Sequence, residues 1–217
     1  MDTKSIMIVG VGGQGSLLAS RILGNVLMAQ GYDVKVSEVH GMSQRGGSVV
    51  TYVKYGDKVY SPVIEKGEAD AIVSFEKLEA ARWLSYLKPE GKLVVSDHQI
   101  DPMPVITGAA TYPEGILEKL QDIGVQVTAV DALSLAESVG NAKASNVVLM
   151  GVLAAKLPFA QNVWEEALAA CVPAKFLELN QKAFALGLEA GGAQKATDAV
   201  QLTAHRQPPV QGQRPSG

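Results

Sequence analysis

The chain has 217 residues, of which 47% are hydrophobic, and its formal net charge is −3 at pH 7. This size predicts one large domain or two small ones with a well-filled core, and the weakly acidic balance argues against a surface for nucleic acid or anionic membranes. The single cysteine, Cys171, excludes an internal disulfide and any zinc or iron–sulfur site built from several thiolates of this chain.

The first elements predict a strand–helix–strand unit. Residues 5–10 form a short apolar run that ends at glycine, as a buried parallel strand does, and residues 16–30 repeat apolar side chains at helical spacing. Gly31 ends the helix, and residues 33–39 predict a second strand. We expect the two strands to be adjacent and parallel, with the glycine-rich segment between strand and helix at the carboxyl edge of the sheet.

The rest of the chain continues an α/β pattern. Residues 48–55 alternate as a strand, and Gly56-Asp57 predicts a turn into a short antiparallel partner that ends near residue 62. Further strands are predicted at 71–75, 92–96 and 125–130, with helices over 77–87 and near 113–123 and mostly helical sequence over 132–188. The predicted fold is a three-layer, Rossmann-like α/β fold with a mostly parallel sheet, an antiparallel hairpin edge and a helical C-terminal third.

The two ends of the chain carry further expectations. No apolar run approaches the roughly 18 residues of a membrane span, and the N-terminal run is shorter than the core of a signal peptide. We therefore expect no membrane partner and a cytoplasmic setting. From Gly191 onward the chain is poor in large apolar residues and ends rich in Pro, Gln and Gly. We expect one domain over 1–190 and a disordered tail over 191–217.

A glycine-rich segment, GVGGQG at residues 10–15, fits the G-x-G-x-x-G pattern in the strand-to-helix context of dinucleotide sites. In such sites the glycines permit a tight turn, a close backbone approach to a phosphate and close helix packing, and an acid ends the second strand. The candidate cofactor-binding residues are Gly10, Gly12, Gly13, Gln14, Gly15 and Glu38. The alternative is that the glycines serve only turn geometry and packing, since residues 60–190 show no obvious proton-transfer residue for a dehydrogenase.

The segment HGMSQRGG lies between two predicted strands and contains more polar and charged side chains than a simple turn requires. It consists of His40, Gly41, Met42, Ser43, Gln44, Arg45, Gly46 and Gly47. The Arg45 guanidinium offers a planar fork of donors for a carboxylate or phosphate, and the glycine pair allows close backbone approach. The alternative is a loop that packs only on its own sheet.

Three other residues stand apart from these motifs. His98 follows a predicted strand and is interpreted as an ordinary loop histidine. Cys171 lies in an apolar helix and is interpreted as a packed residue. Asn146 lies in an otherwise apolar helix and needs a hydrogen-bond partner if it is buried, either within the chain or at an interface.

Several stretches along residues 5–190 resemble, in order, the gamma-type subunits of 2-oxoacid:ferredoxin oxidoreductases. They are GVGGQGSLLASRIL, EVHGMSQRGGSV, VYSPVIEKGEADAIVSFEKLEAAR, YPEGILEKL, GNAKASNVVLMGVLA and ELNQKAFALG. The motif HGMSQRGGSV is most similar to the beta subunits of indolepyruvate ferredoxin oxidoreductases. Pyruvate- and 2-oxoglutarate-type relatives usually have a Gly-Pro-Glu element before the Arg-Gly.

The resemblance implies a complex that oxidatively decarboxylates an aryl 2-oxoacid, transfers the acyl group to coenzyme A and reduces ferredoxin. It implies that thiamine diphosphate, magnesium and the iron–sulfur clusters belong to a large alpha subunit, and that this chain has no catalytic or metal-binding residue of its own. Residues 40–47 would then form a contact loop for the partner subunit or for coenzyme A phosphates. A stand-alone NAD-type dehydrogenase and a nucleotide-sensing module are the alternatives.

Overall fold

A central mixed sheet organises the computed structural model, which describes residues 2–40 and 46–192. The six strands lie in the order β2-β3-β1-β4-β5-β6. Their bounds are Lys4–Val11 for β1, Asp33–His40 for β2, Ser48–Gly56 for β3, Ala69–Ser74 for β4, Leu87–Ser96 for β5 and Gln126–Val130 for β6. Strands β1, β4, β5 and β6 are parallel, whereas β3 runs antiparallel to both of its neighbours, β1 and β2.

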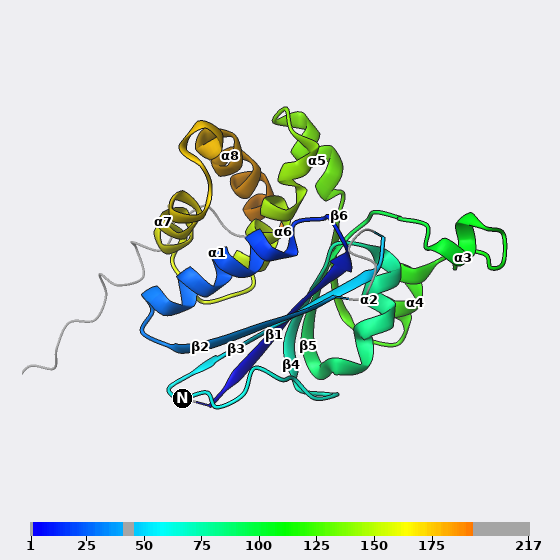
Figure 1. The fold of residues 1–217 in the computed structure, drawn as a ribbon, viewed down its shortest axis with the longest axis horizontal. Helices are drawn as coiled ribbons and strands as arrows, with labels where there is room; N and C mark the ends of the chain where they lie inside the picture. The colour runs from blue at the N-terminus through cyan, green and yellow to red at the C-terminus, as the bar shows by residue number, and fades with distance from the viewer. Residues whose placement is uncertain (1, 41–45, 193–217) are drawn as a thin grey trace, which may run out of the picture.

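Helices cover both faces of the sheet and make the three layers (Figure 1). On one face lie α1 (Ser16–Ala29), α5 (Ala132–Ser138), the short helix η2 (Ala142–Ala144), α6 (Ser145–Ala154), α7 (Gln161–Cys171) and α8 (Ala174–Ala190). On the other face lie α2 (Lys77–Trp83), which continues into η1 (Leu84–Tyr86), and α4 (Ile116–Asp122), while α3 (Met103–Ile106) projects from the loop between β5 and α4. The three-layer α/β prediction is confirmed.

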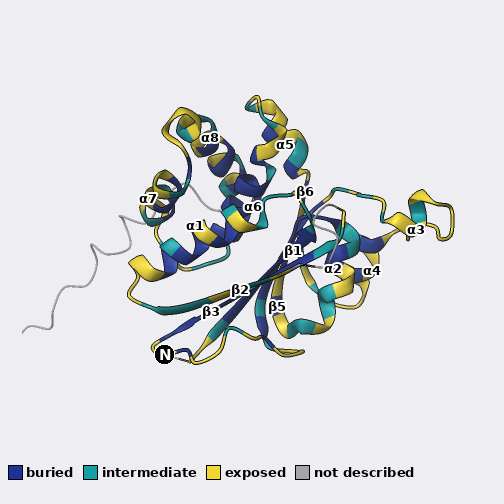
Figure 2. Ribbon diagram, viewed as in Figure 1, coloured by how far each residue is buried: buried dark blue, intermediate teal, exposed yellow. Residues whose placement is uncertain are grey.

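Two hydrophobic cores follow from the alternation of side chains along the central strands. In β1, Ile6 and Ile8 pack with α1 and the C-terminal helices, whereas Met7 and Val9 pack with α2 and α4. All four side chains are 0–1% exposed, so β1 is buried on both faces, as a central parallel strand requires. The burial pattern in Figure 2 shows these two cores on either side of the sheet.

The predicted adjacency of β1 and β2 is wrong, because β3 lies between them. The two strands do run in the same direction, and the glycine-rich segment lies at the carboxyl edge of the parallel strands, as expected. The reason for the difference lies in side-chain composition. Val50 and Val53 of β3 are almost fully buried on opposite faces, whereas β2 carries Lys35 and Glu38 and therefore suits the sheet edge.

The antiparallel edge is present but is formed by β2 and β3. The predicted partner of β3 over residues 57–62 is wrong, since no strand is assigned there. This segment is held instead by the edge strand, where the Asp33 carboxylate accepts a hydrogen bond from Val59 N at 2.9 Å. Strand β5 begins at Leu87, whereas the sequence predicted a start at residue 92. The strand continues through Pro89–Gly91, where its pairing with β4 has an irregular register.

Helices α6 and α8 cross in close contact. A Cβ atom on Gly151 would overlap the Phe184 carbonyl oxygen, and one on Gly187 would overlap the Val148 carbonyl oxygen. Only glycine at both positions lets the two backbones approach this closely. The crossing fixes α6, whose first turn carries Asn146, over the carboxyl edge of the sheet.

Candidate functional site

The glycine-rich segment is held by the side chain of Gln14. Its Oε1 accepts a hydrogen bond from Val11 N at 2.7 Å, and its Nε2 donates to the Phe75 carbonyl at 2.8 Å. Gln14 therefore bridges the ends of β1 and β4, where the chain departs to opposite faces of the sheet. A Cβ atom on Gly10 would lie 2.8 Å from Gln14 Oε1, so glycine is needed beneath this bridge. Such a switch point is where ligands bind in open α/β sheets.

The remaining glycines shape the entry to α1. Gly13 and Gly15 have left-handed backbones, with φ values of 101° and 88°. Gly15 is the N-cap of α1 and provides no side-chain cap. The N–H groups of the first turn of α1 therefore lie without intrahelical acceptors at the positive end of the helix dipole, as an anion site requires.

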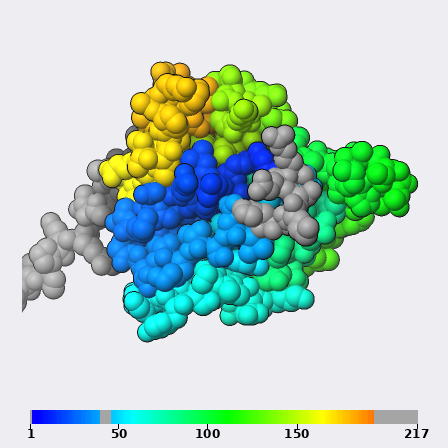
Figure 3. All heavy atoms as spheres, in the orientation of Figure 1, coloured from blue at the N-terminus to red at the C-terminus, as the bar shows by residue number. Residues whose placement is uncertain are grey.

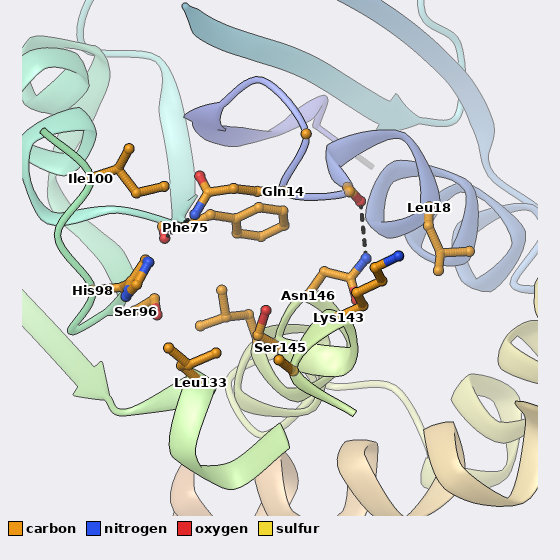
Figure 4. Close-up of a pocket in the computed structure, with 14 residues that line it drawn as sticks. Gln14, Leu18, Phe75, Ser96, His98, Ile100, Leu133, Lys143, Ser145 and Asn146 are labelled. Atoms are coloured by element: carbon orange, nitrogen blue, oxygen red, sulfur yellow. Dashed lines mark hydrogen bonds between the residues drawn. The ribbon is translucent and has the colours of Figure 1, made fainter. Parts of the chain in front are cut away.

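A cavity of about 570 Å³ opens beside this segment (Figure 4). It is lined by Gln14 and Gly15 from the glycine segment, by Phe75, Ser96, His98 and Ile100 from the ends of β4 and β5, by Leu133 of α5, by Lys143 of η2, and by Ser145 and Asn146 at the start of α6. His98, interpreted as an ordinary loop histidine, thus lies in a cavity wall. The cavity combines an apolar lining with a few polar groups, as small-molecule sites do.

Asn146 is the best-placed polar side chain of this cavity. It is only 6% exposed, and its Nδ2 donates to the Gly15 carbonyl at 3.3 Å (Figure 4). Its Oδ1 is buried and has no hydrogen-bond partner within the described residues. Gly15 must be glycine here, because a Cβ atom would overlap Asn146 Nδ2. A buried acceptor without a partner is costly, so it marks a point where a ligand donor would be favoured.

Glu38 approaches the glycine segment from the other side. A hollow of about 330 Å³ is lined by Gly12, Gly13, Gly15, Ser16, Leu17, Glu38 and Val49. The structure therefore brings Glu38 near the start of α1 even though β3 separates β1 from β2. The Glu38 carboxylate accepts a hydrogen bond from Thr51 Oγ1 at 3.3 Å.

The predicted contact loop is only partly described. His40 ends β2, and Gly46 and Gly47 lead into β3, whereas Gly41, Met42, Ser43, Gln44 and Arg45 lie outside the described residues. Gly46 has a left-handed φ of 78°, as its identity allows. The Gly47 carbonyl accepts a hydrogen bond from Gly12 N at 2.9 Å. The base of the loop is thus joined directly to the glycine segment.

A buried acidic pair, which the sequence did not single out, lies beside the base of this loop. Glu76 and Glu79 are 1% and 4% exposed. Glu79 accepts hydrogen bonds from Ser48 Oγ, Trp83 Nε1 and Arg82 Nε. Glu76 Oε2 caps α2 by accepting from Glu79 N at 2.9 Å. The spacing E-x-x-E at the start of an amphipathic helix was the only signal available, and glutamate is not among the usual N-cap residues.

Tyr112 completes the acidic cluster. Its hydroxyl donates to Glu76 Oε1 and accepts a hydrogen bond from Leu78 N at 3.2 Å. Burial, and then the hydrogen bond to the Glu76 carboxylate, raise the pKa of Tyr112 well above its ordinary value. The hydroxyl therefore stays protonated and acts as a fixed donor to Glu76.

The described residues do not fit a resident metal or cluster. Among them, no group of three or more His, Cys, Asp or Glu side chains is arranged to hold a metal ion. Burial raises the pKa of the Cys171 thiol, and Asn25 Nδ2 lies 3.3 Å from its sulfur. A lone neutral thiol cannot supply the four ligands of an iron–sulfur cluster.

No helix in the described part of the chain is long and apolar enough to cross a membrane.

Comparison with known proteins places the chain among oxidoreductases. The family model described as pyruvate ferredoxin/flavodoxin oxidoreductase matches residues 5–190. The chain is 42% identical over 197 residues to the indolepyruvate oxidoreductase subunit IorB of Thermococcus kodakarensis, covering 88% of this chain and 96% of that protein.

Two solved structures share the fold. The gamma subunit of a keto/oxoacid ferredoxin oxidoreductase from Geobacter sulfurreducens has a TM-score of 0.65 and 26% identity, over 87% of this chain and 98% of that one. The 2-oxoglutarate:ferredoxin oxidoreductase of Magnetococcus marinus, solved with 2-oxoglutarate, coenzyme A and succinyl-CoA, has a TM-score of 0.67 and 19% identity, over 90% of this chain and 32% of that one.

These comparisons confirm the resemblance to gamma-type subunits that the sequence motifs suggested. The match spans the sheet, the glycine segment and the C-terminal helices, so it includes every described residue of the candidate site. The chain belongs to the pyruvate ferredoxin/flavodoxin oxidoreductase family.

Proposed function

We propose that the chain is the subunit without iron–sulfur clusters of an indolepyruvate-type 2-oxoacid:ferredoxin oxidoreductase. The complex decarboxylates an aryl 2-oxoacid, forms the acyl-CoA and reduces ferredoxin in the cytoplasm. The observation that carries the proposal is the 42% identity to an indolepyruvate oxidoreductase subunit across 96% of that protein's length. The HGMSQRGGSV motif at residues 40–49 supports the indolepyruvate type over the pyruvate type.

The reactive groups belong, in this proposal, to a large alpha subunit that holds thiamine diphosphate, magnesium and the clusters. The single cysteine of this chain supports that division, because each cluster needs several thiolate ligands. The chain also lacks a Gly-Asp-Gly segment of the kind that thiamine enzymes use to hold magnesium diphosphate.

The contribution of this chain is to help hold coenzyme A at the carboxyl edge of the sheet. Three groups around the cavity support this role: the uncapped start of α1, the Lys143 side chain and the unpaired Asn146 Oδ1. The first two favour phosphate, and the third favours a hydrogen-bond donor. The Magnetococcus marinus relative was solved with coenzyme A bound, which is consistent with this ligand class.

A stand-alone dehydrogenase is not favoured. The Gln14 side chain occupies the point between the ends of β1 and β4 that a dinucleotide pyrophosphate would approach. We therefore assign Gly10 and Gln14 a positioning role, and Gly12, Gly13, Gly15 and Glu38 a role at the cavity mouths.

The purified chain is expected to be colourless and inactive. It should bind no thiamine diphosphate and reduce no viologen dye with indolepyruvate, because it lacks the ligands for both reactive centres. Addition of the large subunit should restore turnover. The measurements are the absorbance spectrum, thiamine diphosphate titration and dye reduction, and a brown preparation or turnover by the chain alone would contradict the proposal.

Lys143→Ala is expected to raise the KM for coenzyme A in the reconstituted complex about tenfold, because it removes one phosphate contact from the cavity rim. The side chain is exposed, so the melting temperature of the chain should not change. Lys182→Ala on α8 is the matched control, since this exposed lysine forms its ion pair with Glu178 on its own helix. Equal KM values in the two variants would remove Lys143 from the site.

A further inference from the structure

A projecting arm separates β5 from α4. The arm comprises residues 102–111 and contains α3, and it stands out from the body of the molecule as the green lobe in Figure 3. From Pro102 to Pro113 the sequence, PMPVITGAATYP, contains no charged residue. Met103 and Ile106 are 67% and 65% exposed at its surface. An exposed, uncharged and apolar projection is unusual on a soluble surface and is typical of a protein-binding element.

One buried carboxylate holds both ends of the arm. Glu76 Oε1 accepts a hydrogen bond from Ile100 N at 3.3 Å, before the arm, and one from the Tyr112 hydroxyl, after it. Val105 packs against the core beneath α2 and α4. The helical turn of α3 is closed by hydrogen bonds such as Val105 N to the Pro102 carbonyl, at 2.8 Å. The arm is therefore a preorganised knob, which lowers the entropic cost of docking.

The base of the arm is continuous with the candidate site. Ile100 lines both the 570 Å³ cavity and a second cavity of about 210 Å³, which Glu76 and Gly46 also line. A chain that docks on the arm would therefore also lie over the carboxyl edge of the sheet. If that edge holds coenzyme A, as in the proposed function, a partner that carries the reactive centre would lie against it.

The shape of the arm argues against a second copy of this chain as its occupant. A two-fold dimer needs a self-complementary patch, and two convex knobs cannot bury each other. If the arm entered a cavity of another copy, the contact would be heterologous and would build open filaments. The lack of charge also disfavours nucleic acid and charged peptides.

We propose that the arm at residues 102–111 docks, through Met103 and Ile106, into an uncharged apolar groove on the large catalytic subunit. The inference rests on the proposed function and deepens it, since it names the surface by which the two subunits join. A few residues at the centre of such a contact contribute most of its affinity.

The test uses the double variant Met103→Ser/Ile106→Ser in the full chain. Its affinity for the purified large subunit, measured by titration calorimetry, should fall by at least about tenfold. Its melting temperature should match that of the wild type, because both side chains are already exposed. The matched control is Ile123→Ser, whose side chain is 68% exposed at the end of α4 and whose affinity should stay within about twofold of wild type.

The outcomes separate the two proposals. If the wild-type chain does not bind the large subunit, the proposed function fails and the arm proposal fails with it. If the wild type binds and the double variant binds equally well, the arm proposal alone is overturned. Sedimentation gives the third outcome. If the free wild-type chain self-associates and the double variant does not, the arm is a contact between copies and the proposal is likewise overturned.

Discussion

Gly187→Ala is expected to destabilise the chain by about 3 kcal/mol, near the upper end of what overpacking a core usually costs. The added Cβ would overlap the Val148 carbonyl oxygen and lie within 2.8 Å of the Val148 carbonyl carbon. Both are backbone atoms, so a side-chain rotation cannot relieve the clash and the two helices must move apart. Such a shift would loosen the core around Phe184 and Trp164, which stack at 6.0 Å between centroids.

The matched control is Gly24→Ala in α1. Gly24 is also a buried helical glycine, but no atom lies within 4 Å of the Cβ that alanine would add. Alanine lowers the entropic cost of forming the helix, so this variant should be more stable than wild type by about 0.5–1 kcal/mol. Denaturant midpoints of the two variants, measured side by side, should therefore move in opposite directions. Equal midpoints would mean that the contact between α6 and α8 does not require glycine at position 187.

The crossing also links stability to the candidate site. Helix α6 carries Ser145 and Asn146 in its first turn, and both line the 570 Å³ cavity. Because Asn146 Nδ2 donates to the Gly15 carbonyl, a displaced α6 would also release the start of α1. The close glycine contact between α6 and α8 is thus part of what keeps the cavity in shape.

Local patterns in the sequence were enough to predict most of the fold. Helical spacing over residues 16–30 and the apolar runs at β1, β4, β5 and β6 are properties of single segments, and each was found. The order of the strands is a property of the whole sheet. Whether β3 inserts between β1 and β2 depends on which strand buries more apolar surface. Rules that pair consecutive elements do not take this burial into account.

The candidate site divides in the same way. The glycine segment has a sequence signature, because positive φ and close contact demand glycine at positions such as Gly13 and Gly15. The hydrogen bond between Glu76 and Tyr112 has no sequence signature, because 36 residues separate two side chains that meet only after folding. The cavity likewise combines residues from Gly13 to Leu149. The unpaired Asn146 Oδ1 is visible only once its neighbours are placed.

Arg45→Ala is expected to have the largest effect on activity. If residues 40–47 form the proposed contact loop, the variant should weaken subunit assembly or coenzyme A use by about 2–5 kcal/mol, which is at least about thirtyfold. Arg45 itself lies outside the described residues, but the base of its loop does not. Gly47 accepts a hydrogen bond from Gly12 N, so the loop begins beside the glycine segment and the cavity mouths.

Two comparisons make this prediction specific. Arg45→Lys should restore little of the lost function, because an ammonium group cannot reproduce a bidentate contact. Arg21→Ala, at an exposed position of α1, should leave assembly and turnover unchanged. The measurement is paired: thermal unfolding of each isolated variant, then partner affinity and coenzyme A-dependent turnover of the reconstituted complex. Wild-type turnover in Arg45→Ala would make the loop ordinary surface. A large fall in melting temperature would instead make Arg45 a structural residue, paired within its own chain.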